Sequence, residues 1–546
     1  MGYEEVVEKK MELVRVNIDG RECEVPVGTN VIQAAAKLGI EIPHFCYHTK
    51  LSVSGNCRMC LVEMGMPIKN KETGEIIKDE KGPTRISWGS KPVIACGTEV
   101  VDGMHIRTRT EKIKECQRGV IEFLLLNHPL DCPICDKAGE CRLQEYAFEF
   151  GRGYSRSHEE KNCKPKQTQI GERIILDDER CILCSRCIRF CREVIKEDYL
   201  GFTDRGSYTT LTCLPGKPFN SNYSLNTVDI CPVGALTSTD FRFKMRVWFL
   251  KKTPSICTES STGVNTFVWS REGKIYRITP RRNDAVNGHW MTDSGRLLYK
   301  EQEGERLSRY YLDGAHTDYE ETIVRIASLL EEGKVACICS GRMTLEEQYL
   351  LSLIMRKVNG KVWLIGHDEE GDGFLIDKDR TPNVQGALLT GLTTTNPITS
   401  LNELKESIEK NLIKTLIVCN EDLAQIGLNP ELQKKVKLIH IGTRRHPASS
   451  TIRAEIPSLT VFEKDGTFIN RQRRLQKFHQ AVPFRPGVFP DYCFWDSILN
   501  FLQSQETSFR PLNDIWTSMS QHLAPLNNIH FSKIPLDGIQ LEGTVL

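Results

Sequence analysis

Alternating apolar and polar residues predict a small β domain near the amino terminus. Residues 13–25 alternate on either side of Asp19-Gly20, a dipeptide that tight hairpin turns favour. Apolar residues at helical spacing then occupy 31–38, and Asn30 can cap this helix. A hairpin and a helix ahead of a cysteine-containing loop are typical of a β-grasp fold. We therefore expect a β-grasp domain over residues 1–110.

The pattern changes after residue 110. Apolar residues at helical spacing predict a helix that ends at Pro129, because proline cannot continue a helix, and His128 then lies at the helix end. Short apolar runs between 174 and 236 fit a ferredoxin-like domain with a core formed partly by a metal cluster. Residues 65–91 are polar and rich in turn residues, and they predict an inserted loop or hairpin that adds no core.

Strands and helices alternate in the carboxy-terminal half. The pattern predicts two βαβ units, over residues 335–365 and 416–441, with helices opened by Thr344 and by Asn429. We therefore expect an α/β domain over residues 306–546. Neither helix follows a glycine-rich phosphate-binding motif, so the sequence lends no support to dinucleotide or nucleoside triphosphate binding.

The composition is that of a folded protein with several domains. With 546 residues, 40% of them hydrophobic and 26% charged, the chain is too long for one core and too apolar to be disordered. Its formal net charge of +1 does not favour nucleic acid or an anionic membrane surface as a partner. The amino terminus lacks the basic and apolar regions of a signal peptide, and a run of about 18 apolar residues occurs nowhere. We expect no signal peptide, lipid anchor or transmembrane segment.

Cysteine is concentrated in the first third of the chain. Fourteen of the 21 cysteines precede residue 192, and paired C-x2-C spacings indicate metal binding more often than disulfides. The first array has the spacing C-x10-C-x2-C-x35-C, and four thiolates are the ligands of a [2Fe-2S] cluster. A zinc knuckle is the alternative, but the β-grasp pattern ahead of the array favours the cluster. The candidate ligands are Cys46, Cys57, Cys60 and Cys96.

The second array combines one histidine with three cysteines in the spacing H-x3-C-x2-C-x5-C. We interpret it as a [4Fe-4S] module over residues 111–150, in which a neutral imidazole replaces one thiolate. A lone histidine near cysteines is more often not a ligand, but this spacing favours ligation. Zinc bound by three Cys and one His is the chemical competitor. The candidate ligands are His128, Cys132, Cys135 and Cys141.

The third array lies in the expected ferredoxin-like domain, over residues 151–248. Cys181, Cys184 and Cys187 are followed by two candidates for a fourth ligand, Cys191 and Cys231. In two-cluster ferredoxins the last cysteine, which precedes a proline, binds the cluster of the other motif. Cys231 precedes a proline whereas Cys191 does not, so we expect one [4Fe-4S] cluster that uses Cys231. Cys191 would then be a packed thiol.

The remaining residues carry no recognisable catalytic signal. No Ser/His/Asp set, paired carboxylates or H-E-x-x-H motif is present, so we expect no catalytic residues and no hydrolytic chemistry. The basic runs 444–445 and 471–474 are interpreted as solvated faces or ion-paired residues. Several cysteines have no ligand spacing, and we expect them to be buried small residues. These are Cys23, Cys116, Cys163, Cys213, Cys337, Cys339, Cys419 and Cys493.

The order of the three arrays resembles the family of the large iron-sulfur subunit of respiratory complex I, the G subunit of NADH-quinone oxidoreductase. Iron-only hydrogenases share its amino-terminal modules. Residues 253–284 look like the small domain that opens the molybdopterin oxidoreductase fold, and residues 466–476 look like a later part of that fold. The stretches that carry the resemblance to complex I are 94–98, 127–133, 187–190 and 231–236.

The resemblance implies an electron relay with one [2Fe-2S] and two [4Fe-4S] clusters. Single electrons would pass from NADH through FMN, both bound only by a partner subunit, and then through this chain toward quinone. Implied partners are the NADH/FMN-binding subunit, a small [2Fe-2S] subunit and the quinone-module subunits. The implied location is the cytoplasmic side of the inner (plasma) membrane, where the chain would be peripheral through membrane subunits.

Two departures from the family pattern affect the carboxy-terminal part. Some members hold a further [4Fe-4S] cluster near residue 257, but here Cys257 has no companion cysteine before Cys337. We therefore expect a small molybdopterin-oxidoreductase-like domain without a cluster over residues 249–305. The α/β domain that follows is shorter than the full fold, so we expect a degenerate, truncated scaffold over 306–546.

Two other functions fit parts of the pattern. The same cluster modules would serve the electron-transfer subunit of an NAD-linked hydrogenase or formate dehydrogenase. A zinc-stabilised scaffold without a redox role belongs to a different class, and it would give a colourless protein that does not respond to dithionite.

Overall fold

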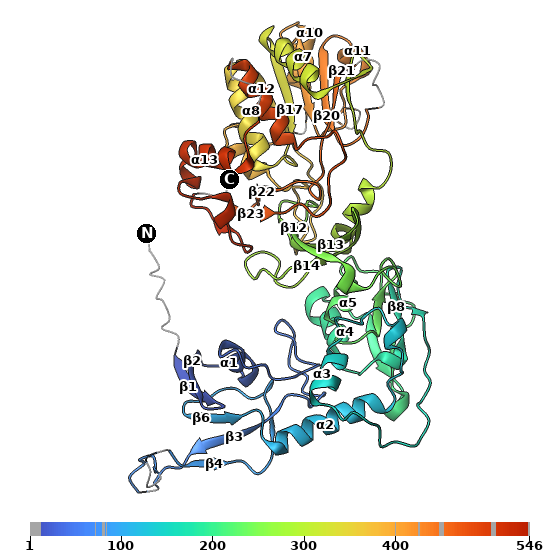
Figure 1. The fold of residues 1–546 in the computed structure, drawn as a ribbon, viewed down its shortest axis with the longest axis vertical. Coiled ribbons are helices and arrows are strands. Elements are labelled where there is room, and N and C mark those ends of the chain that lie inside the picture. Colours follow the sequence, from blue (N-terminus) through green and yellow to red (C-terminus); the bar gives the residue numbers. More distant parts are fainter. Residues whose placement is uncertain are drawn as a thin grey trace. The chain divides into compact units, whose positions relative to one another are not determined.

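The computed structural model describes residues 12–70, 72–78, 82, 84–398, 400–423, 426–446, 452–503 and 509–543. The chain forms two compact units, the amino-terminal unit (residues 1–247) and the carboxy-terminal unit (residues 248–546). They are coloured from blue to green and from green to red in Figure 1. Among the described residues, no helix has both the length and the apolar composition needed to cross a bilayer.

A mixed sheet with one helix opens the amino-terminal unit. β1 and β2 form the predicted hairpin, and Asp19 (φ 49°) and Gly20 (φ 84°) adopt left-handed conformations at its turn. The strand order is β2-β1-β6-β3-β4, with β1 and β6 parallel and β5 paired with β3. Asn30 and Gln33 form the capping box of α1. The elements are β1 (Leu13–Ile18), β2 (Arg21–Pro26), α1 (Val31–Lys37), β3 (Leu61–Pro67), β4 (Ile86–Trp88), β5 (Val93–Ile94) and β6 (Met104–Arg107).

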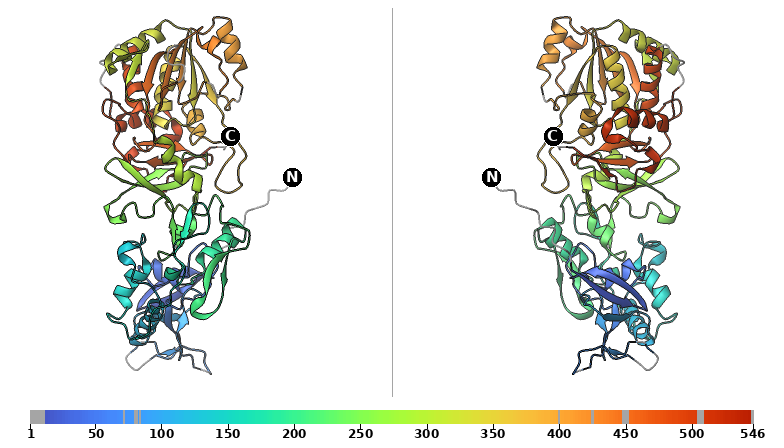
Figure 2. Two further views of the ribbon diagram at one scale, coloured as in Figure 1. Left: turned by 90° about the vertical axis from the view of Figure 1, so that its right-hand side faces the viewer. Right: turned by 90° about the vertical axis from the view of Figure 1, so that its left-hand side faces the viewer.

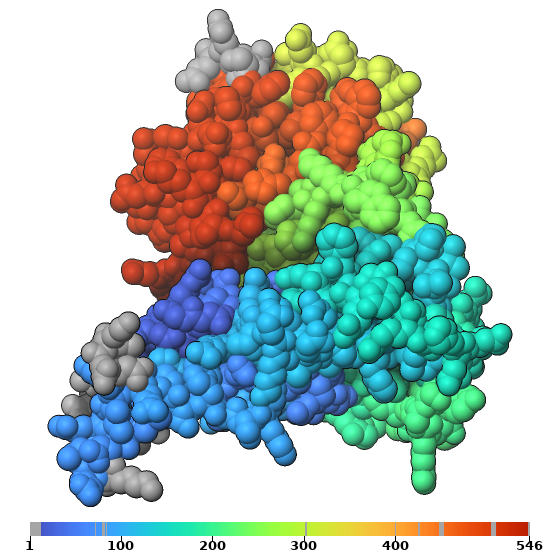
Figure 3. All heavy atoms as spheres, turned by 60° about the horizontal axis from the view of Figure 1, so that its bottom comes forward, coloured from blue at the N-terminus to red at the C-terminus, as the bar shows by residue number. Residues whose placement is uncertain are grey.

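The inserted residues 65–91 form a hairpin. β3 and β4 pair antiparallel, with Gly65 opposite Trp88 and Pro67 opposite Ile86. The described part of this hairpin, coloured blue, projects from the rest of the amino-terminal unit in Figures 1 and 3. The hairpin separates Cys60 from Cys96 along the chain but not in space, because β5, which follows it, pairs with the start of β3.

Two helices and a small ferredoxin-like region complete this unit. Thr110 caps α2, and proline ends the helix as predicted, so that His128 follows its carboxyl end. β11, β8 and β7 form one antiparallel sheet, and β9 pairs with β10. The elements are α2 (Glu111–Leu126), η1 (Cys132–Ile134), α3 (Arg142–Phe150), β7 (Thr168–Gln169), β8 (Ile174–Leu176), η2 (Asp178–Arg180), α4 (Arg186–Phe190), η3 (Cys191–Ile195), β9 (Leu200–Thr203), η4 (Gly206–Tyr208), β10 (Thr210–Cys213), α5 (Asn226–Ile230) and β11 (Leu236–Ser238).

The carboxy-terminal unit begins with a three-stranded antiparallel sheet. β12 pairs with β13, and β13 pairs with β14. A second small sheet, in the order β22-β23-β24, lies beside it, because the amide of His479 just after β23 donates to the carbonyl of Pro254 in β12 (3.1 Å). The elements are η5 (Val247–Phe249), β12 (Lys251–Ile256), β13 (Asn265–Arg271), β14 (Lys274–Pro280), α6 (Asp293–Leu297), η6 (Leu298–Gln302), β22 (Gly466–Ile469), β23 (Arg474–Phe478) and β24 (Ile539–Gln540).

A seven-stranded sheet forms the centre of the carboxy-terminal unit, in the order β16-β15-β21-β20-β19-β17-β18. The five strands from β21 to β18 are parallel. Both predicted βαβ units are present, as β17-α8-β18 and β19-α11-β20. The strands are β15 (Tyr310–Leu312), β16 (Ala315–Thr317), β17 (Val335–Ser340), β18 (Lys361–Ile365), β19 (Thr415–Cys419), β20 (Lys437–Gly442) and β21 (Ile452–Pro457).

Helices cover both faces of this sheet (Figure 2). Successive residues of a strand point to opposite faces. Cys337 and Cys339 of β17 therefore pack with α7, α8 and α12, whereas Ala336 and Ile338 pack with α10 and α11. The helices are α7 (Tyr319–Glu331), α8 (Leu345–Lys357), α9 (Val384–Leu389), α10 (Asn402–Glu409), α11 (Pro430–Gln433), α12 (Asp491–Leu502), α13 (Leu512–His522), η8 (Ala524–Leu526) and η9 (Phe531–Lys533).

A buried ion triad connects three elements of this unit. The ammonium of Lys464 donates to Glu347 of α8 (2.5 Å) and to Asp491 of α12 (2.8 Å), and all three side chains are buried. Removing one partner of such a group leaves a buried charge uncompensated, at a cost of about 3–5 kcal/mol.

We therefore expect Lys464→Met to destabilise the carboxy-terminal unit strongly. The melting temperature followed by tryptophan fluorescence should fall by roughly 5–8 °C. Lys437→Met is the matched control, because Lys437 pairs with Glu332 in a partly exposed position and should cost less than about 1 kcal/mol. Equal losses in the two variants would contradict the role of the triad.

Candidate metal centres

The sheet of the amino-terminal unit brings the first cysteine array together. Cys46, Cys57 and Cys60 lie in the loop between α1 and β3, and Cys96 follows β5. Because β5 pairs with β3, the amide of Ala95 donates to the carbonyl of Cys60 (2.9 Å), which places Cys96 beside Cys60. Hydrogen bonds from Cys57 and Cys96 lower the pKa of Cys46, and a hydrogen bond from Cys96 lowers the pKa of Cys60. All four sulfur atoms are therefore neighbours.

Small residues let the backbone approach these sulfur atoms. The amides of Asn56 and Cys57 donate to the sulfur of Cys46 and help to lower its pKa. Gly55 has a φ of 66°, in the left-handed region, and Gly97 packs so closely that an added Cβ would lie 3.0 Å from the Ile94 side chain. Hydrogen bonds of this kind to sulfur ligands are among the factors that set cluster potentials.

The second array lies between α2 and α3. Cys132 begins η1 and is exposed, Cys135 is buried, and Cys141 is the amino-terminal cap of α3. Burial raises the pKa of Cys135 and raises that of Cys141 to about 11. The neighbouring Cys132 raises the pKa of Cys135 further, and Cys135 does the same for Cys141. The three thiols are therefore gathered in one region.

His128 is half-buried at the end of α2. Burial lowers its pKa to about 4, and the cations Arg180 and Lys161 contribute to this lowering, so the imidazole is neutral at neutral pH. A neutral imidazole is the form that binds metal. His128 lies between α2 and the η1 segment that begins with Cys132, next to this array in the chain.

The second array packs against the segment that follows Cys231. A Cβ built on Gly234 would overlap the sulfur of Cys135. The guanidinium of Arg246 donates to the carbonyl of Cys135 (2.6 Å), and the amide of Arg142 donates to the carbonyl of Pro232 (3.1 Å). The second and third arrays are therefore adjacent within the unit.

The backbone of the third array turns sharply, so that its cysteine side chains lie close together. Leu183 (φ 53°) and Ser185 (φ 60°) adopt left-handed conformations on either side of Cys184, which turns the chain sharply between the three cysteines. Burial raises the pKa of all three, and the nearby Cys231 raises each of them further. The cysteines concerned are Cys181, Cys184 and Cys187.

Cys191 lies one helical turn after Cys187, where α4 ends and η3 begins. Cys191 is among the groups that raise the pKa of Cys187, and Cys213 helps to raise the pKa of Cys191 itself. Its thiol is fully buried, and burial raises its pKa to about 12. A protonated thiol in this environment packs as a small apolar group.

Two arginines connect the first and third arrays. Arg189 donates to the carbonyl of Cys46 (2.5 Å) and to the carbonyl of Cys184 (3.3 Å), and it also bonds the carbonyl of Ser52. Arg186 donates to the carbonyls of Tyr47 and Ile230. These bonds fix the two cysteine loops relative to each other. The sequence did not predict this role, because the loops are far apart along the chain.

A mononuclear metal site and a cluster differ in how closely their ligands must converge. In the described part of the chain, no three His, Cys, Asp or Glu side chains converge in the way that holds one metal ion. All ligands of a single zinc ion lie within about 2.3 Å of it. A four-iron cluster distributes its four ligands over four metal atoms, so ligands spread further apart still fit it.

The unassigned cysteines only partly match the expectation of burial. Cys337, Cys339, Cys419 and Cys493 are buried as predicted, whereas the prediction is wrong for Cys163, which is exposed. Cys163 lies in an irregular segment whose sequence neighbours are mostly lysine and asparagine, and such polar residues favour solvent over a core. Cys23, Cys116 and Cys213 are half-buried.

Cysteine arrays in series, the first beside a mixed sheet with one helix, are typical of an iron-sulfur protein with several cluster domains. Family models match consecutive segments of the chain. They are a 2Fe-2S iron-sulfur cluster binding domain (residues 11–111), the NADH-ubiquinone oxidoreductase-G iron-sulfur binding region (117–156), the ferredoxin-like domain of NADH-quinone oxidoreductase subunit 3 (171–237) and the NDSU1/NuoG-like 4Fe-4S domain of NADH-ubiquinone oxidoreductase (250–300).

The chain is also similar to curated G subunits of NADH-quinone oxidoreductase. It is 38% identical to that of Rickettsia felis over 353 residues, which cover 63% of this chain and 49% of the relative. It is 37% identical to that of Rickettsia prowazekii over 360 residues, which cover 65% and 50%. The resemblance to the G subunit is thus confirmed over these residues, and the chain spans about half the length of the curated relatives it matches.

One solved structure, an NAD+-reducing [NiFe]-hydrogenase in the H2-reduced state, matches 43% of this chain and 91% of its own. The identity is 24% and the TM-score is 0.33, which is too low to assign a fold.

The residues of the fourth matched segment do not fit a [4Fe-4S] cluster. Cys257 is the only cysteine between Cys231 and Cys337, and it is buried beside Glu259. The hydroxyl of Thr292 donates to the carboxylate of Glu259, and a Cβ added to Gly295 would lie 2.7 Å from the sulfur of Cys257. One thiol cannot supply the four cysteine ligands of such a cluster.

Proposed function

We propose that this chain is an electron-transfer subunit of NADH-quinone oxidoreductase. It would relay single electrons from an NADH/FMN-binding subunit through iron-sulfur clusters toward quinone, without a substrate site of its own. The observation that supports this most strongly is the gathering of three cysteine arrays in one unit. Each lies in a segment that matches an iron-sulfur domain, and two of these domains are named for this enzyme.

We assign three clusters to the three arrays. Such clusters supply one-electron transfer at potentials between about −700 and +450 mV, set by their ligands, hydrogen bonds and burial. The chain's own residues hold the ligands, exclude water and place the arrays side by side. The proposed ligands are Cys46, Cys57, Cys60 and Cys96 for a [2Fe-2S] cluster, His128, Cys132, Cys135 and Cys141 for a [4Fe-4S] cluster, and Cys181, Cys184, Cys187 and Cys231 for a second [4Fe-4S] cluster.

The position of Cys231 supports it as the fourth ligand of the third array. It is among the leading charges that raise the pKa of all three other cysteines, whereas Cys191 is among them for Cys187. Cys231 directly follows the short helix α5, and the bond from Arg186 to the carbonyl of Ile230 holds this helix end against the array.

Metal analysis of the anaerobically isolated chain tests this proposal. We expect about ten iron atoms per chain, with matching sulfide and reductant-dependent paramagnetic resonance signals from each cluster type. Zinc in the middle site would contradict the second assignment. A colourless protein that stays silent under dithionite would contradict the relay as a whole.

We further propose that the partners are the NADH/FMN-binding subunit, a small [2Fe-2S] subunit and the quinone-module subunits, on the cytoplasmic side of the inner membrane. Affinity purification of the tagged chain from its host identifies them. Recovery with membrane and quinone-module subunits is expected. Recovery with a nickel or molybdenum subunit would instead support the hydrogenase or formate dehydrogenase alternative.

Arg189 provides a prediction about the first cluster. Its positive charge lies against the Cys46 carbonyl and stabilises the reduced cluster, by about 1–2 kcal/mol at an effective dielectric constant near 20. We expect Arg189→Gln to lower the midpoint potential of the [2Fe-2S] cluster by roughly 40–90 mV, measured by a redox titration followed by paramagnetic resonance.

Two control variants separate charge from general disruption. Arg189→Lys keeps the charge, so the midpoint potential of its [2Fe-2S] cluster should stay close to that of the unmodified chain. Arg192→Gln removes an exposed arginine that pairs with Asp198, and it should leave the potential unchanged. A potential that is the same in Arg189→Gln and the unmodified chain would show that Arg189 has no electrostatic role.

A further inference from the structure

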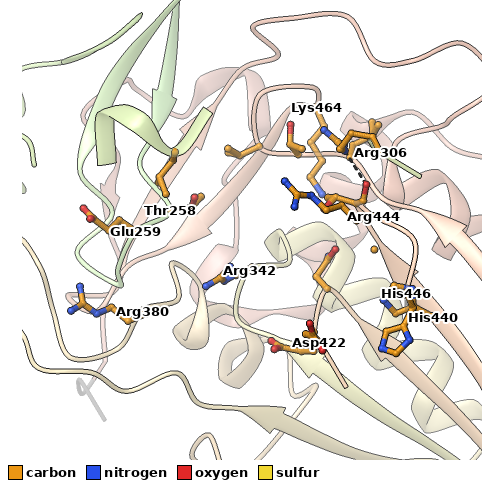
Figure 4. A pocket seen from close by; sticks show the side chains of 18 of the residues that line it. Thr258, Glu259, Arg306, Arg342, Arg380, Asp422, His440, Arg444, His446 and Lys464 are labelled. Carbon is orange, nitrogen blue, oxygen red and sulfur yellow. Dashed lines mark hydrogen bonds between the residues drawn. The ribbon is translucent and has the colours of Figure 1, made fainter. Parts of the chain in front are cut away.

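The carboxy-terminal unit contains a pocket of about 980 Å³ that the proposed electron relay does not use (Figure 4). Its lining comes from the loops that follow all five parallel strands. Residues from these loops are Arg342 after β17, Arg380 after β18, Glu421 after β19, Arg444 after β20 and Thr460 after β21. Its volume is at the upper end of the range for small-molecule sites.

The topology of the sheet places this pocket at a switch point. The chain leaves β17 through α8 to β18 on one side, while β19, β20 and β21 follow on the other side of β17. Between β17 and β19 the connections therefore run in opposite directions, which opens a crevice at the carboxyl ends of the strands. In open α/β sheets, ligands bind in this crevice.

One side of the crevice presents an arginine without a partner. Within the described residues, the guanidinium of Arg342 makes no hydrogen bond and no ion pair. In Figure 4, Arg342 lies between Arg380 and Arg444 among the residues that line the pocket. An exposed guanidinium at this position is available for an anionic group, for which its planar fork of donors is well suited.

The other side presents buried polar atoms without partners. Glu421 is 5% exposed, and one carboxylate oxygen binds His367 (2.8 Å), but the second oxygen has no hydrogen bond in the described structure. His440 is also 5% exposed, and its Nδ1 has no partner among the described residues. Leaving such atoms unsatisfied costs about 1–3 kcal/mol each, so they point to a bound group that supplies hydrogen bonds.

Three other cations of the pocket already pair with carboxylates. Arg306 pairs with Glu463 (2.9 Å), and Arg445 pairs with Glu455 (3.2 Å). Lys464 belongs to the buried triad. Among the described residues, the open chemistry of the pocket includes the Arg342 guanidinium on one side and the unsatisfied Glu421 oxygen and His440 Nδ1 on the other.

A ligand that satisfies both sides must carry an anionic group and hydrogen-bond donors. We propose that this pocket binds a nucleoside phosphate, with the phosphate at Arg342 and a ribose hydroxyl or base amino group at Glu421. At the start of α8, the capping box already uses the amides of Thr344 and Glu347. The proposed phosphate contact is therefore the Arg342 side chain, and it needs no glycine-rich motif ahead of this helix.

Titration calorimetry of the full-length chain with ADP, GDP, pyrophosphate and adenosine tests this proposal. We expect one site per chain for at least one of the nucleoside diphosphates, with weaker binding of pyrophosphate and of adenosine. Arg342→Gln and Glu421→Gln should each weaken nucleotide binding about tenfold or more, since each removes a charge-assisted contact.

Arg325→Gln is the matched control, because Arg325 lies exposed on α7 and does not line the pocket. It should bind the nucleotide as the unmodified chain does. The absence of binding at millimolar ADP and GDP would overturn the proposal, as would equal affinities in Arg342→Gln and Arg325→Gln. Pyrophosphate binding as tight as ADP would overturn the nucleoside part. Glu421→Gln provides an independent test if Arg342→Gln does not fold.

Discussion

Replacing Cys231 by alanine is expected to remove one complete [4Fe-4S] cluster from the chain. Cys231 lies near the three other cysteines of the third array. A cluster that loses one of its four cysteine ligands loses an iron-sulfur bond and leaves one iron open to solvent. Iron should fall by about four atoms of roughly ten per chain. The corresponding resonance signal should disappear, while the [2Fe-2S] signal remains.

Cys191→Ala is the matched variant, because it removes another buried thiol of the same region. Cys191 is fully buried and packs beside Cys213, so its loss should cost about 1–2 kcal/mol of stability and leave the iron content unchanged. The reverse outcome, with iron lost from the Cys191 variant and retained in the Cys231 variant, would assign the fourth ligand to Cys191.

Adding a single methyl group at Gly234 is expected to disrupt the middle cluster. A Cβ at this position would overlap the sulfur of Cys135, and neither the backbone after Cys231 nor the cysteine can move without disturbing an array. We expect Gly234→Ala to lose most of the second [4Fe-4S] cluster, about four iron atoms. Iron analysis with paramagnetic resonance measures this loss.

Gly119→Ala is the control for Gly234→Ala. Gly119 lies within α2, where an added Cβ meets nothing within 4 Å, and alanine favours a helix by about 1 kcal/mol over glycine. This variant should keep its iron and gain stability. A Gly234→Ala chain with full iron content would show that the second array does not depend on this close contact.

The local elements of the fold could largely be predicted from the sequence. The alternation around Asp19-Gly20 predicted the first hairpin, and the caps at Thr344 and Asn429 predicted the helices of both βαβ units. These signals succeed because caps, turns and periodic burial depend on residues close together in the chain. The order of the strands has no such local signal, and the sequence did not predict it.

Long-range contacts account for what the sequence left out. Arg189 acts on Cys46 from 143 residues away, and the nucleotide pocket combines loops after five different strands. Gly234 matters only because its neighbour in space is Cys135. The basic run 444–445, interpreted as solvated or ion-paired, proves to line this pocket, with Arg445 paired to Glu455.

By itself, the sequence determined the identity and spacing of the candidate ligands, because a short loop such as that from Cys181 to Cys187 brings its own cysteines together whatever surrounds it. The tertiary structure decided which distant residues join each loop. Pairing of β5 with β3 brings Cys96 to the first array, and the turn after α5 brings Cys231 to the third. The physical reason is that closing a loop of many residues costs chain entropy, which only the packing of the whole unit repays.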